Sequence, residues 1–490
     1  MILLINPQSA KRVFRLPLSI LSVASSIEGK YDYQILDENF DRPLEKLISQ
    51  TIEKDDIRYI GFTVMPGPQL NRAVPTSKFI RNRYPGIKII WGGYFPSQHV
   101  KTVLNSEYVD YIVRNQGEEC FPRLIDALEH RQPVDTIPSL SWKNGNVIVD
   151  NPQGAILNPN TLPPLPYHKI NVPRYITRSY LGMRTSVSHS SVGCPFLCGF
   201  CSVAGLYKGG WIGRDPDALA DELLRQKKEW GIDSLDFFDN NFFVGEKRSA
   251  RFGERMSGKN ISWWAEGRPD TLMHYSDETL RLLSEGGCKM IFLGVESSSL
   301  EILHTMDKGG TQTPEMALEL CERMKKFNII PELSFILGNP SETVDEDIER
   351  DIQFIRKAKK INPRAEIVLH IYSPVFFDDA QMYQESLHRG FHFPQTLDDW
   401  VSPHWAQFNS LRNPRTPWLK PSHRRRIYNF EATIDAAFPT VTDFRLRPWH
   451  RRVLRALGGM RYRFSAYNAP YEIKVAKKAM HYLAPQKEGL

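Results

Sequence analysis

Residues 191–203 read SVGCPFLCGFCSV, which places three cysteines, Cys194, Cys198 and Cys201, within eight positions. A structural zinc site takes four nitrogen or sulfur ligands, often as two C-x2-C pairs. This chain has no second pair, although His189 is near the cluster. An iron–sulfur cluster is also held by thiolates, usually four for a [4Fe–4S] cluster. Three thiolates would leave one iron open to a small molecule, so the spacing favours an iron–sulfur cluster, with zinc as the alternative.

The cysteines follow the first of six predicted strands between residues 183 and 385. These strands are TSVSHSS (185–191), SLDFFDNNF (234–242), ISWWAEGR (261–268), KMIFLGVES (289–297), ELSFILGNP (332–340) and AEIVLHIYSP (365–374). Helical periodicity lies between them, for example at 215–231 and 314–328. Six βα units are too few for a closed eight-fold barrel. They predict a partial (βα)6, TIM-like barrel with its chemistry at the carboxyl ends of the strands.

The sequence C-P-F-L-C-G-F-C resembles the CxxxCxΦC motif of radical S-adenosylmethionine (SAM) enzymes, with Phe200 as the aromatic residue. This resemblance implies that Cys194, Cys198 and Cys201 hold a [4Fe–4S] cluster whose open iron chelates the amino and carboxylate groups of S-adenosylmethionine. One electron from the cluster then cleaves the sulfonium and makes a 5′-deoxyadenosyl radical. The family's external electron donor is of the flavodoxin or ferredoxin type.

Two further segments resemble the SAM-binding strands of this family. FFDNNF (237–242) implies that Asp239 and Asn240 meet the methionine amino group, against the alternative of an Asx-rich turn. WWAEGRPD (263–270) implies that Arg268 meets the carboxylate or ribose, and an ordinary ion pair is the alternative.

Two later strand ends complete the resemblance. GVESSS (294–299) implies that Glu296 and Ser297 lie near the ribose, and a carboxylate at a buried strand end rarely lacks a partner or role. ILGNPSET (336–343) implies that Gly338 lets the backbone approach adenine closely.

Residues 1–150 alternate short apolar runs with helical patterns and predict an N-terminal Rossmann-like parallel sheet. No G-x-G-x-x-G follows the first strand, which excludes the usual dinucleotide fingerprint. The first 130 residues instead resemble the cobalamin-binding domain that precedes many radical SAM domains, through LLINPQ, ILDENF, IGFTVMPG, WGGYFPS and VRNQGEECFPRLI. The resemblance implies that Thr63, Gly92 and Gly93 line the channel for the nucleotide tail of cobalamin.

The loop after the first strand, NPQSAKRVF, departs from the D-x-H-x-x-G motif of other cobalamin domains because it has no His. The lower cobalt ligand would then be water or absent. The alternative is a domain that keeps the fold without the cofactor.

Composition places the chain among globular proteins, since 41% of its 490 residues are hydrophobic and 24% are charged. No run approaches the ~20 apolar residues of a membrane span, and MILLINPQSAKRVF lacks a secretory pattern, so a cytoplasmic protein is expected. A Pro-rich linker is predicted at 151–182 and a basic, mainly helical tail at 386–490. Residues 411–490 hold 17 Lys and Arg against five Asp and Glu. The tail could be a solvated helical cap on the barrel, or it could make a peripheral contact with an anionic membrane. Binding of a nucleic acid is the less favoured alternative.

These observations predict a cobalamin-dependent radical SAM enzyme that C-methylates an unactivated carbon of a small molecule. The expected substrate is a lipid, a tetrapyrrole or another natural product. A hydrophobic substrate agrees with a membrane-facing tail, because such molecules reside in membranes. Cobalamin-assisted oxidation or cyclisation, as in the anaerobic magnesium-protoporphyrin monomethyl ester cyclase, is the alternative within enzymes. A zinc-containing nucleic-acid-binding protein is the alternative of another class.

Overall fold

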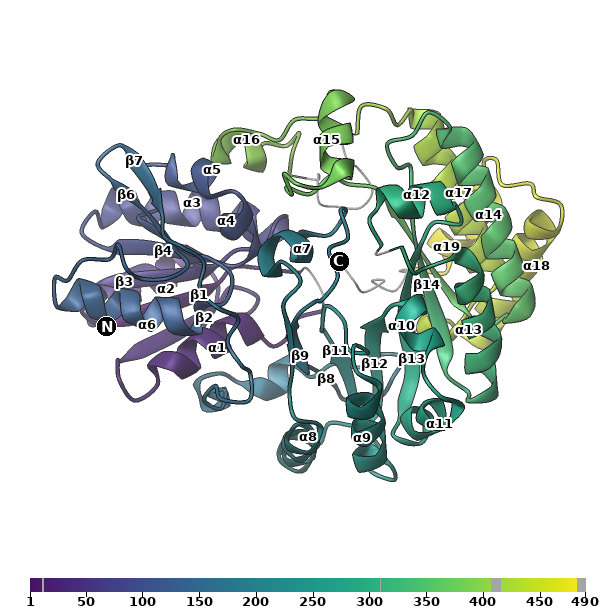
Figure 1. The fold of residues 1–490 in the computed structure, drawn as a ribbon, viewed down its shortest axis with the longest axis horizontal. Coiled ribbons are helices and arrows are strands. Elements are labelled where there is room, and N and C mark those ends of the chain that lie inside the picture. Colours follow the sequence, from purple (N-terminus) through teal and green to yellow (C-terminus); the bar gives the residue numbers. More distant parts are fainter. Residues whose placement is uncertain (11–12, 309, 407–415, 483–490) are drawn as a thin grey trace.

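The computed structural model describes residues 1–10, 13–308, 310–406 and 416–482. It consists of an N-terminal α/β domain, a barrel-like second domain and a helical C-terminal region (Figure 1). None of the helices formed by the described residues combines the length and apolar character that crossing a bilayer requires.

The N-terminal domain is built on a seven-stranded sheet of order β2-β1-β3-β4-β5-β6-β7. Its five parallel strands are β1 (Ile2–Asn6), β2 (Tyr33–Asp37), β3 (Tyr59–Thr63), β4 (Lys88–Gly92) and β5 (Tyr111–Val113), as predicted. The helices are α1 (Leu18–Ile27), α2 (Leu44–Lys54), α3 (Pro68–Arg83), α4 (Tyr94–Gln98), α5 (Val100–Leu104) and α6 (Gly117–Glu129). Alternate residues of β1 enter two separate apolar clusters, so the sheet is covered on both faces.

An antiparallel hairpin extends this sheet beyond β5. It consists of β6 (Leu140–Asn144) and β7 (Val147–Asp150), and Gly145 at its turn has φ +60°. The sequence interpretation missed this hairpin, although its two loop residues, Gly145 and Asn146, are a pair typical of two-residue hairpin loops.

The second domain is a curved sheet of six parallel strands in the order β15-β14-β13-β12-β11-β8, as the predicted partial barrel requires. The strands are β8 (Thr185–Ser188), β11 (Ser234–Phe237), β12 (Ser262–Gly267), β13 (Cys288–Glu296), β14 (Ile330–Leu337) and β15 (Glu366–Ile371). The main helices outside it are α8 (Pro216–Trp230), α9 (Glu246–Met256), α11 (Asp277–Glu285), α13 (Pro314–Lys326) and α14 (Val344–Ile361). Three short helices follow strands at its upper edge: α7 (Ser202–Tyr207), α10 (Pro269–Met273) and α12 (Leu300–Thr305).

The predicted linker is ordered and packs against both domains. It forms two 3-10 turns, Tyr167–Lys169 and Val172–Tyr175. The Tyr175 hydroxyl donates a 2.7 Å hydrogen bond to Asp37 of β2, and the Tyr167 ring packs on Trp230 of α8. The segment therefore joins the two domains as well as connecting them in sequence.

The C-terminal region is helical, as predicted, but it covers two different parts of the molecule. It comprises α15 (Gln381–His388), α16 (Leu397–Val401), α17 (Pro421–Ala437), α18 (Pro448–Arg463) and α19 (Tyr471–Ala479). Residues Phe391, Leu397 and Trp400 belong to the core of the N-terminal domain. Helix α17 packs against β15 and α14, and α18 packs on α17 at the far side of the barrel (Figure 1).

Candidate functional site

The three cysteines lie on the loop between β9 (Ser191–Gly193) and α7. Strand β9 pairs antiparallel with β10 (Trp211–Gly213), which follows α7, so the cysteine loop and α7 lie between the two strands of this pair. Gly193 has φ +76°, and a Cβ there would lie 2.2 Å from the Gly210 carbonyl oxygen. Only glycine therefore allows the close backbone approach that sends the chain into Cys194.

The three thiols are neighbours in a largely buried environment. Burial raises the pKa of Cys194 and raises that of Cys201 to about 12, and Cys198 raises both further. Thiols with such high pKa values stay protonated at neutral pH unless a metal cation replaces the proton. Among the described residues, no three His, Cys, Asp or Glu side chains are arranged to hold a single metal ion. In an iron–sulfur cluster each thiolate binds a different iron, so the three thiols need not converge on one ion.

Arg268 faces this loop from the end of β12. Its Nη1 donates to the Cys198 sulfur at 3.2 Å, and its guanidinium carbon lies 3.7 Å from the centre of the Phe196 ring. Asp270 holds the guanidinium with two hydrogen bonds of 3.0 and 2.7 Å. Burial alone would lower the pKa of Arg268, but Asp270 and the nearby thiols raise it above its ordinary value. A fixed positive charge is therefore held against the sulfur of Cys198.

Lys308, which the sequence interpretation missed, connects three of the predicted residues. Its carbonyl accepts from Arg268 at 2.6 Å, its Nζ lies 3.2 Å from the Glu296 carboxylate, and the same Nζ lies 5.7 Å from the Phe200 ring centre. Lys308 is only 4% exposed. Glu296 sits at a bulge of β13 with φ +67°. Phe200, Arg268 and Glu296 are thus brought together beside the cysteine loop.

Glu266, on β12, is a second functional candidate that the sequence interpretation did not single out. The protein packed around it, together with Glu332, Asp239 and Glu296, raises its pKa to about 8. A carboxylic acid that is protonated at neutral pH can donate a hydrogen bond or move a proton. Its position two residues before Arg268 on a strand end was the available signal.

Three other predicted SAM-binding residues are engaged within the protein. Both oxygens of Asp239 accept from the backbone N–H of Ser190 at 2.9 Å, so Asp239 braces the turn between β8 and β9. The Ser297 hydroxyl donates to Asp351 at 3.3 Å. Gly338, with φ +73°, has its carbonyl bonded to the Trp418 indole at 3.0 Å. The structure places these residues at the strand ends, as expected, while their polar groups or backbone have protein partners.

The predicted cobalamin residues gather at the carboxyl edge of the N-terminal sheet. The Thr63 hydroxyl lies 3.1 Å from that of Ser19, and Gly92 follows on the next strand. Gly93 has φ +101°, and a Cβ there would lie 2.9 Å from the Val64 carbonyl oxygen. This edge is therefore kept free of side chains at Gly92 and Gly93.

Hydrogen bonds from α4 connect this edge to the barrel, and one of them reaches a predicted site residue. The Tyr94 hydroxyl, directly after Gly93, donates to the Asn240 side-chain oxygen at 3.4 Å. Asn240 is therefore the predicted site residue that meets the N-terminal domain.

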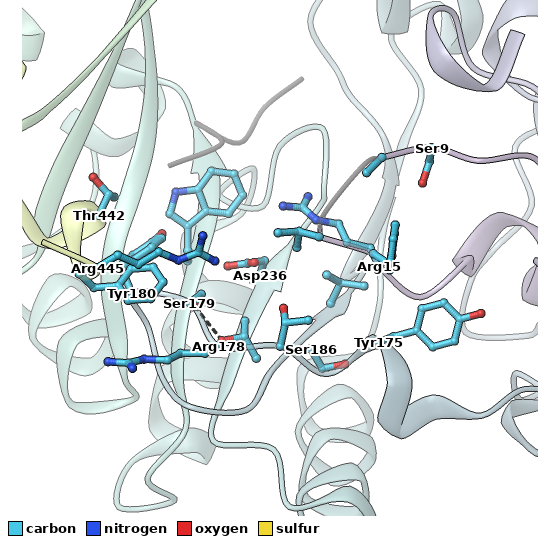
Figure 2. A pocket seen from close by; sticks show the side chains of 18 of the residues that line it. Ser9, Arg15, Tyr175, Arg178, Ser179, Tyr180, Ser186, Asp236, Thr442 and Arg445 are labelled. Atoms are coloured by element: carbon cyan, nitrogen blue, oxygen red, sulfur yellow. Dashed lines mark hydrogen bonds between the residues drawn. The ribbon is translucent and has the colours of Figure 1, made fainter. Parts of the chain in front are cut away.

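A cavity of about 780 Å³ runs from the barrel interior to the N-terminal domain (Figure 2). Its volume is in the range of sites that enclose small organic ligands. Its lining comes from inward-facing barrel residues Ser186, Asp236, Trp264, Glu332 and Glu366, from Gln8, Ser9, Ala10, Arg15 and Asn71 of the N-terminal domain, and from Arg178, Thr442, Phe444 and Arg445. The buried Ser186 hydroxyl has no hydrogen-bond partner among the described residues.

The residues present fit the three cofactors expected at such a site. Three neighbouring thiols with an arginine against one of them suit an iron–sulfur cluster. Polar strand ends around Lys308 and Glu296 suit a zwitterionic ligand such as S-adenosylmethionine. The cavity beside Gln8 and Ser9, at the carboxyl edge of the N-terminal sheet, leaves room there for part of a large ligand such as cobalamin.

Comparison with known proteins identifies both domains. Residues 189–355 match the family model of the radical SAM superfamily, and residues 15–125 match that of the B12 binding domain. An uncharacterized methyltransferase of Pyrococcus horikoshii is 30% identical over 73% of this chain and 78% of its own length. The anaerobic magnesium-protoporphyrin IX monomethyl ester cyclase of Synechocystis is 25% identical over 70% of this chain and 68% of its own length.

The solved structure of the radical S-adenosylmethionine methyltransferase TsrM from Kitasatospora setae has the same fold. It superposes with a TM-score of 0.65 at 15% identity and covers 98% of this chain and 99% of its own. The likeness extends over the C-terminal region as well as both domains.

Proposed function

This chain belongs to the radical SAM superfamily and carries an N-terminal B12 binding domain, and on that premise we propose that it C-methylates an unactivated carbon. When bound, the cluster with S-adenosylmethionine supplies the radical that removes a hydrogen atom, and cobalamin supplies the methyl group. The overall reaction consumes one substrate C–H group, two S-adenosylmethionine molecules and two electrons. It yields the C–CH3 group, S-adenosylhomocysteine, 5′-deoxyadenosine and methionine. The electrons come from a flavodoxin- or ferredoxin-type donor.

The observation that carries this proposal is the shared cavity. Its walls include both inward-facing barrel residues and the loop after β1, so a substrate in it lies between the two cofactor domains. Trp264, Phe444 and Tyr180 offer it apolar surface, and the arginines at either end suit an anionic group. The lining also contains carboxylates, those of Asp236, Glu332, Glu366 and Asp443. We therefore assign to the cavity an amphiphilic small molecule with an apolar part and polar or charged groups, such as a lipid or a tetrapyrrole.

Each protein group has a defined role in this proposal. Cys194, Cys198 and Cys201 hold the cluster, and Arg268 keeps positive charge against Cys198. Lys308 holds the Glu296 carboxylate in place beside the cysteine loop, and Glu266 on β12 holds a proton. We propose the domain division 1–150, 151–182, 183–385 and 386–490, with the first unit binding cobalamin through Thr63, Gly92 and Gly93, and a cytoplasmic protein.

The test uses reconstituted enzyme, a chemical reductant, S-adenosylmethionine with a deuterated methyl group and candidate lipids and tetrapyrroles. Methyl transfer predicts a product heavier by the labelled methyl and equal amounts of S-adenosylhomocysteine and 5′-deoxyadenosine. Cys198→Ala should abolish both nucleoside products, while Cys321→Ala, at a buried cysteine of α13 away from the site, should keep them.

Oxidative cyclisation is the second candidate, favoured by the similarity to the Synechocystis cyclase over 70% of this chain. It predicts 5′-deoxyadenosine and a product that has lost hydrogen, without S-adenosylhomocysteine in proportion to turnover. The ratio of the two nucleosides therefore separates the two reactions.

A further inference from the structure

Exposed apolar side chains are concentrated at the C-terminal end of the molecule. Of the described residues, twelve large hydrophobic side chains are exposed, and seven of them lie between residues 441 and 475. These seven are Val441, Trp449, Val453, Met460, Phe464, Tyr471 and Val475. Exposed apolar residues scattered singly are normal on a protein surface, whereas apolar side chains gathered on one face mark an interaction site.

Helix α18 and its C-cap residue, Phe464, carry four of them in one row. Trp449, Val453, Met460 and Phe464 are spaced by four, seven and four residues, which puts them on one helix face. Met460 is 68% exposed and Phe464 is 71% exposed. The opposite side of the helix is already in use, because Leu454 is buried. The exposed row therefore does not contribute to the packing of the fold.

The opposite side of α18 is held tightly against α17. A Cβ on Gly458 would lie 2.4 Å from the backbone nitrogen of Ala437. This close contact fixes the helix, so the row cannot turn inward to bury itself. Figure 1 places α18 at the outer edge of the barrel, away from the N-terminal domain.

Positive charge surrounds this row. Residues 445–478 contain ten Lys and Arg and one acidic residue, Glu472, which pairs with Arg461. Arg452, Arg455 and Arg463 are exposed, and no described carboxylate lies within ion-pair distance of them. Unpaired arginines beside an exposed apolar row complement a surface that is both anionic and apolar.

We propose that this face, formed by α18 and α19, docks on the surface of an anionic lipid bilayer. Helix α18 would lie in the plane of the interface, with Trp449, Met460 and Phe464 entering the acyl boundary and the arginines at the headgroups. A nucleic acid would take the arginines but leave the apolar row in water, so the lipid surface accounts for both features.

The cavity reaches the same part of the chain. Phe444 and Arg445, which line it, precede α18 directly, and Arg178 lies over the Phe444 ring at 5.2 Å. Docking would hold this end of the cavity toward the lipid, where an amphiphilic substrate resides. This consequence for the substrate rests on the proposed function, whereas the docking itself does not.

Vesicle flotation of the reconstituted full chain tests the docking. The probes are vesicles of phosphatidylcholine alone and vesicles with phosphatidylglycerol as about a third of the lipid. We expect at least about tenfold stronger binding to the anionic vesicles, reduced by high salt because the charge contribution is screened. Trp449→Ser/Phe464→Ser should lose at least about tenfold in binding, and Arg452→Glu/Arg455→Glu/Arg463→Glu should lose the anionic preference.

Two matched variants serve as controls. Val147→Ser/Met183→Ser removes exposed apolar side chains elsewhere, and Lys228→Glu/Lys247→Glu/Lys325→Glu makes the same charge change on α8, α9 and α13. Both should bind vesicles like the parent. Absent or equal binding to the two vesicle types, or equal losses in the controls, would overturn the proposal. So would a parent dimer that Trp449→Ser/Phe464→Ser converts to a monomer, since the face would then join two copies.

The outcome is separable from the reaction. Vesicle binding without S-adenosylhomocysteine formation would leave the docking intact and count against methyl transfer. Labelled product without vesicle binding would support methyl transfer and overturn the docking proposal.

Discussion

Arg268 contacts both the cysteine loop, through the Cys198 sulfur, and helix α10, which follows the barrel strand β12, through Asp270. It is 6% exposed, and its charge is balanced by Asp270, which is 4% exposed. Removing one member of a buried pair leaves the other charge without compensation, which costs more than the pair contributes. Arg268 therefore has a measurable structural role besides its contact with Cys198.

Arg268→Met in the iron-free protein is expected to lower the free energy of unfolding by about 3–5 kcal/mol, measured by urea denaturation. Arg268→Met/Asp270→Asn should recover part of the loss because it removes the stranded charge. Arg281→Met, at an exposed ion pair of α11, should cost less than about 1 kcal/mol. Equal effects at Arg268 and Arg281 would contradict the buried-pair account.

Glu266 predicts an unusual dependence of stability on pH. Its pKa of about 8 in the folded protein lies above the ordinary value of 4.5. Between these two pH values the folded state retains a proton that the unfolded state has released, so stability falls as pH rises through this window. The slope from this residue is at most about 1.4 kcal/mol per pH unit.

Glu266→Gln should therefore flatten the fall in melting temperature between about pH 5 and pH 8 and be more stable than the parent at the upper end. Glu285→Gln, at an exposed position of α11, is the control and should follow the parent. A variant whose melting temperature changes with pH as steeply as the parent's would show that Glu266 titrates normally.

Sequence patterns singled out the cysteines, Phe200, Arg268 and Glu296 because each lies in a segment resembling the family, and the structure brings these residues together. They did not locate Lys308, which follows α12 in an ordinary-looking DKGG turn. A lysine in such a turn is usually solvated, and its burial at 4% arises only when β13 and the cysteine loop fold against it. Asp239 was placed correctly at a strand end, but its bonds to Ser190 depend on tertiary contacts that a sequence does not display.

At the scale of elements, the antiparallel pair of β9 and β10 positions the cysteine loop. Gly193→Ala combines an unfavourable φ with a clash against Gly210. We expect this variant to lose most of its bound iron after reconstitution. Gly258→Ala has a similar φ of +70° but nothing within 4 Å of the added carbon. It should cost only about 1–2 kcal/mol of stability and keep its iron, which iron analysis of both proteins checks.

If Gly258→Ala lost iron to the same extent, general backbone strain would explain the effect. The strand pair would then have no specific role in holding the cysteines.

The main strands and helices were predictable because their apolar periodicity is strong. The order of the linker was not, since its Pro-rich composition is typical of exposed segments while Tyr175 and Tyr167 anchor it through long-range contacts. The packing of Trp400 on the N-terminal domain was also missed, because residues about 300 positions apart share that core. Local sequence carries no record of such pairings.

For the whole molecule, the contact between Tyr175 and Asp37 joins the domains that border the cavity. A hydrogen bond to a charged group contributes about 1.5–3 kcal/mol. Tyr175→Phe should therefore loosen the domains and speed hydrogen–deuterium exchange in β2 and residues 172–175. Tyr471→Phe, at a side chain 70% exposed on α19, should leave exchange there unchanged. Unaltered exchange in Tyr175→Phe would mean that other contacts hold the domains.

The central claim is that one chain holds both an iron–sulfur cluster and cobalamin. It is tested most directly by counting metals after anaerobic reconstitution with iron, sulfide and hydroxocobalamin and removal of the excess. We predict about four irons and about one cobalt per chain, with iron lost and cobalt kept in Cys198→Ala. Cobalt absent from a protein that holds its iron would contradict the cobalamin-dependent reaction, and zinc in place of iron would contradict the account as a whole.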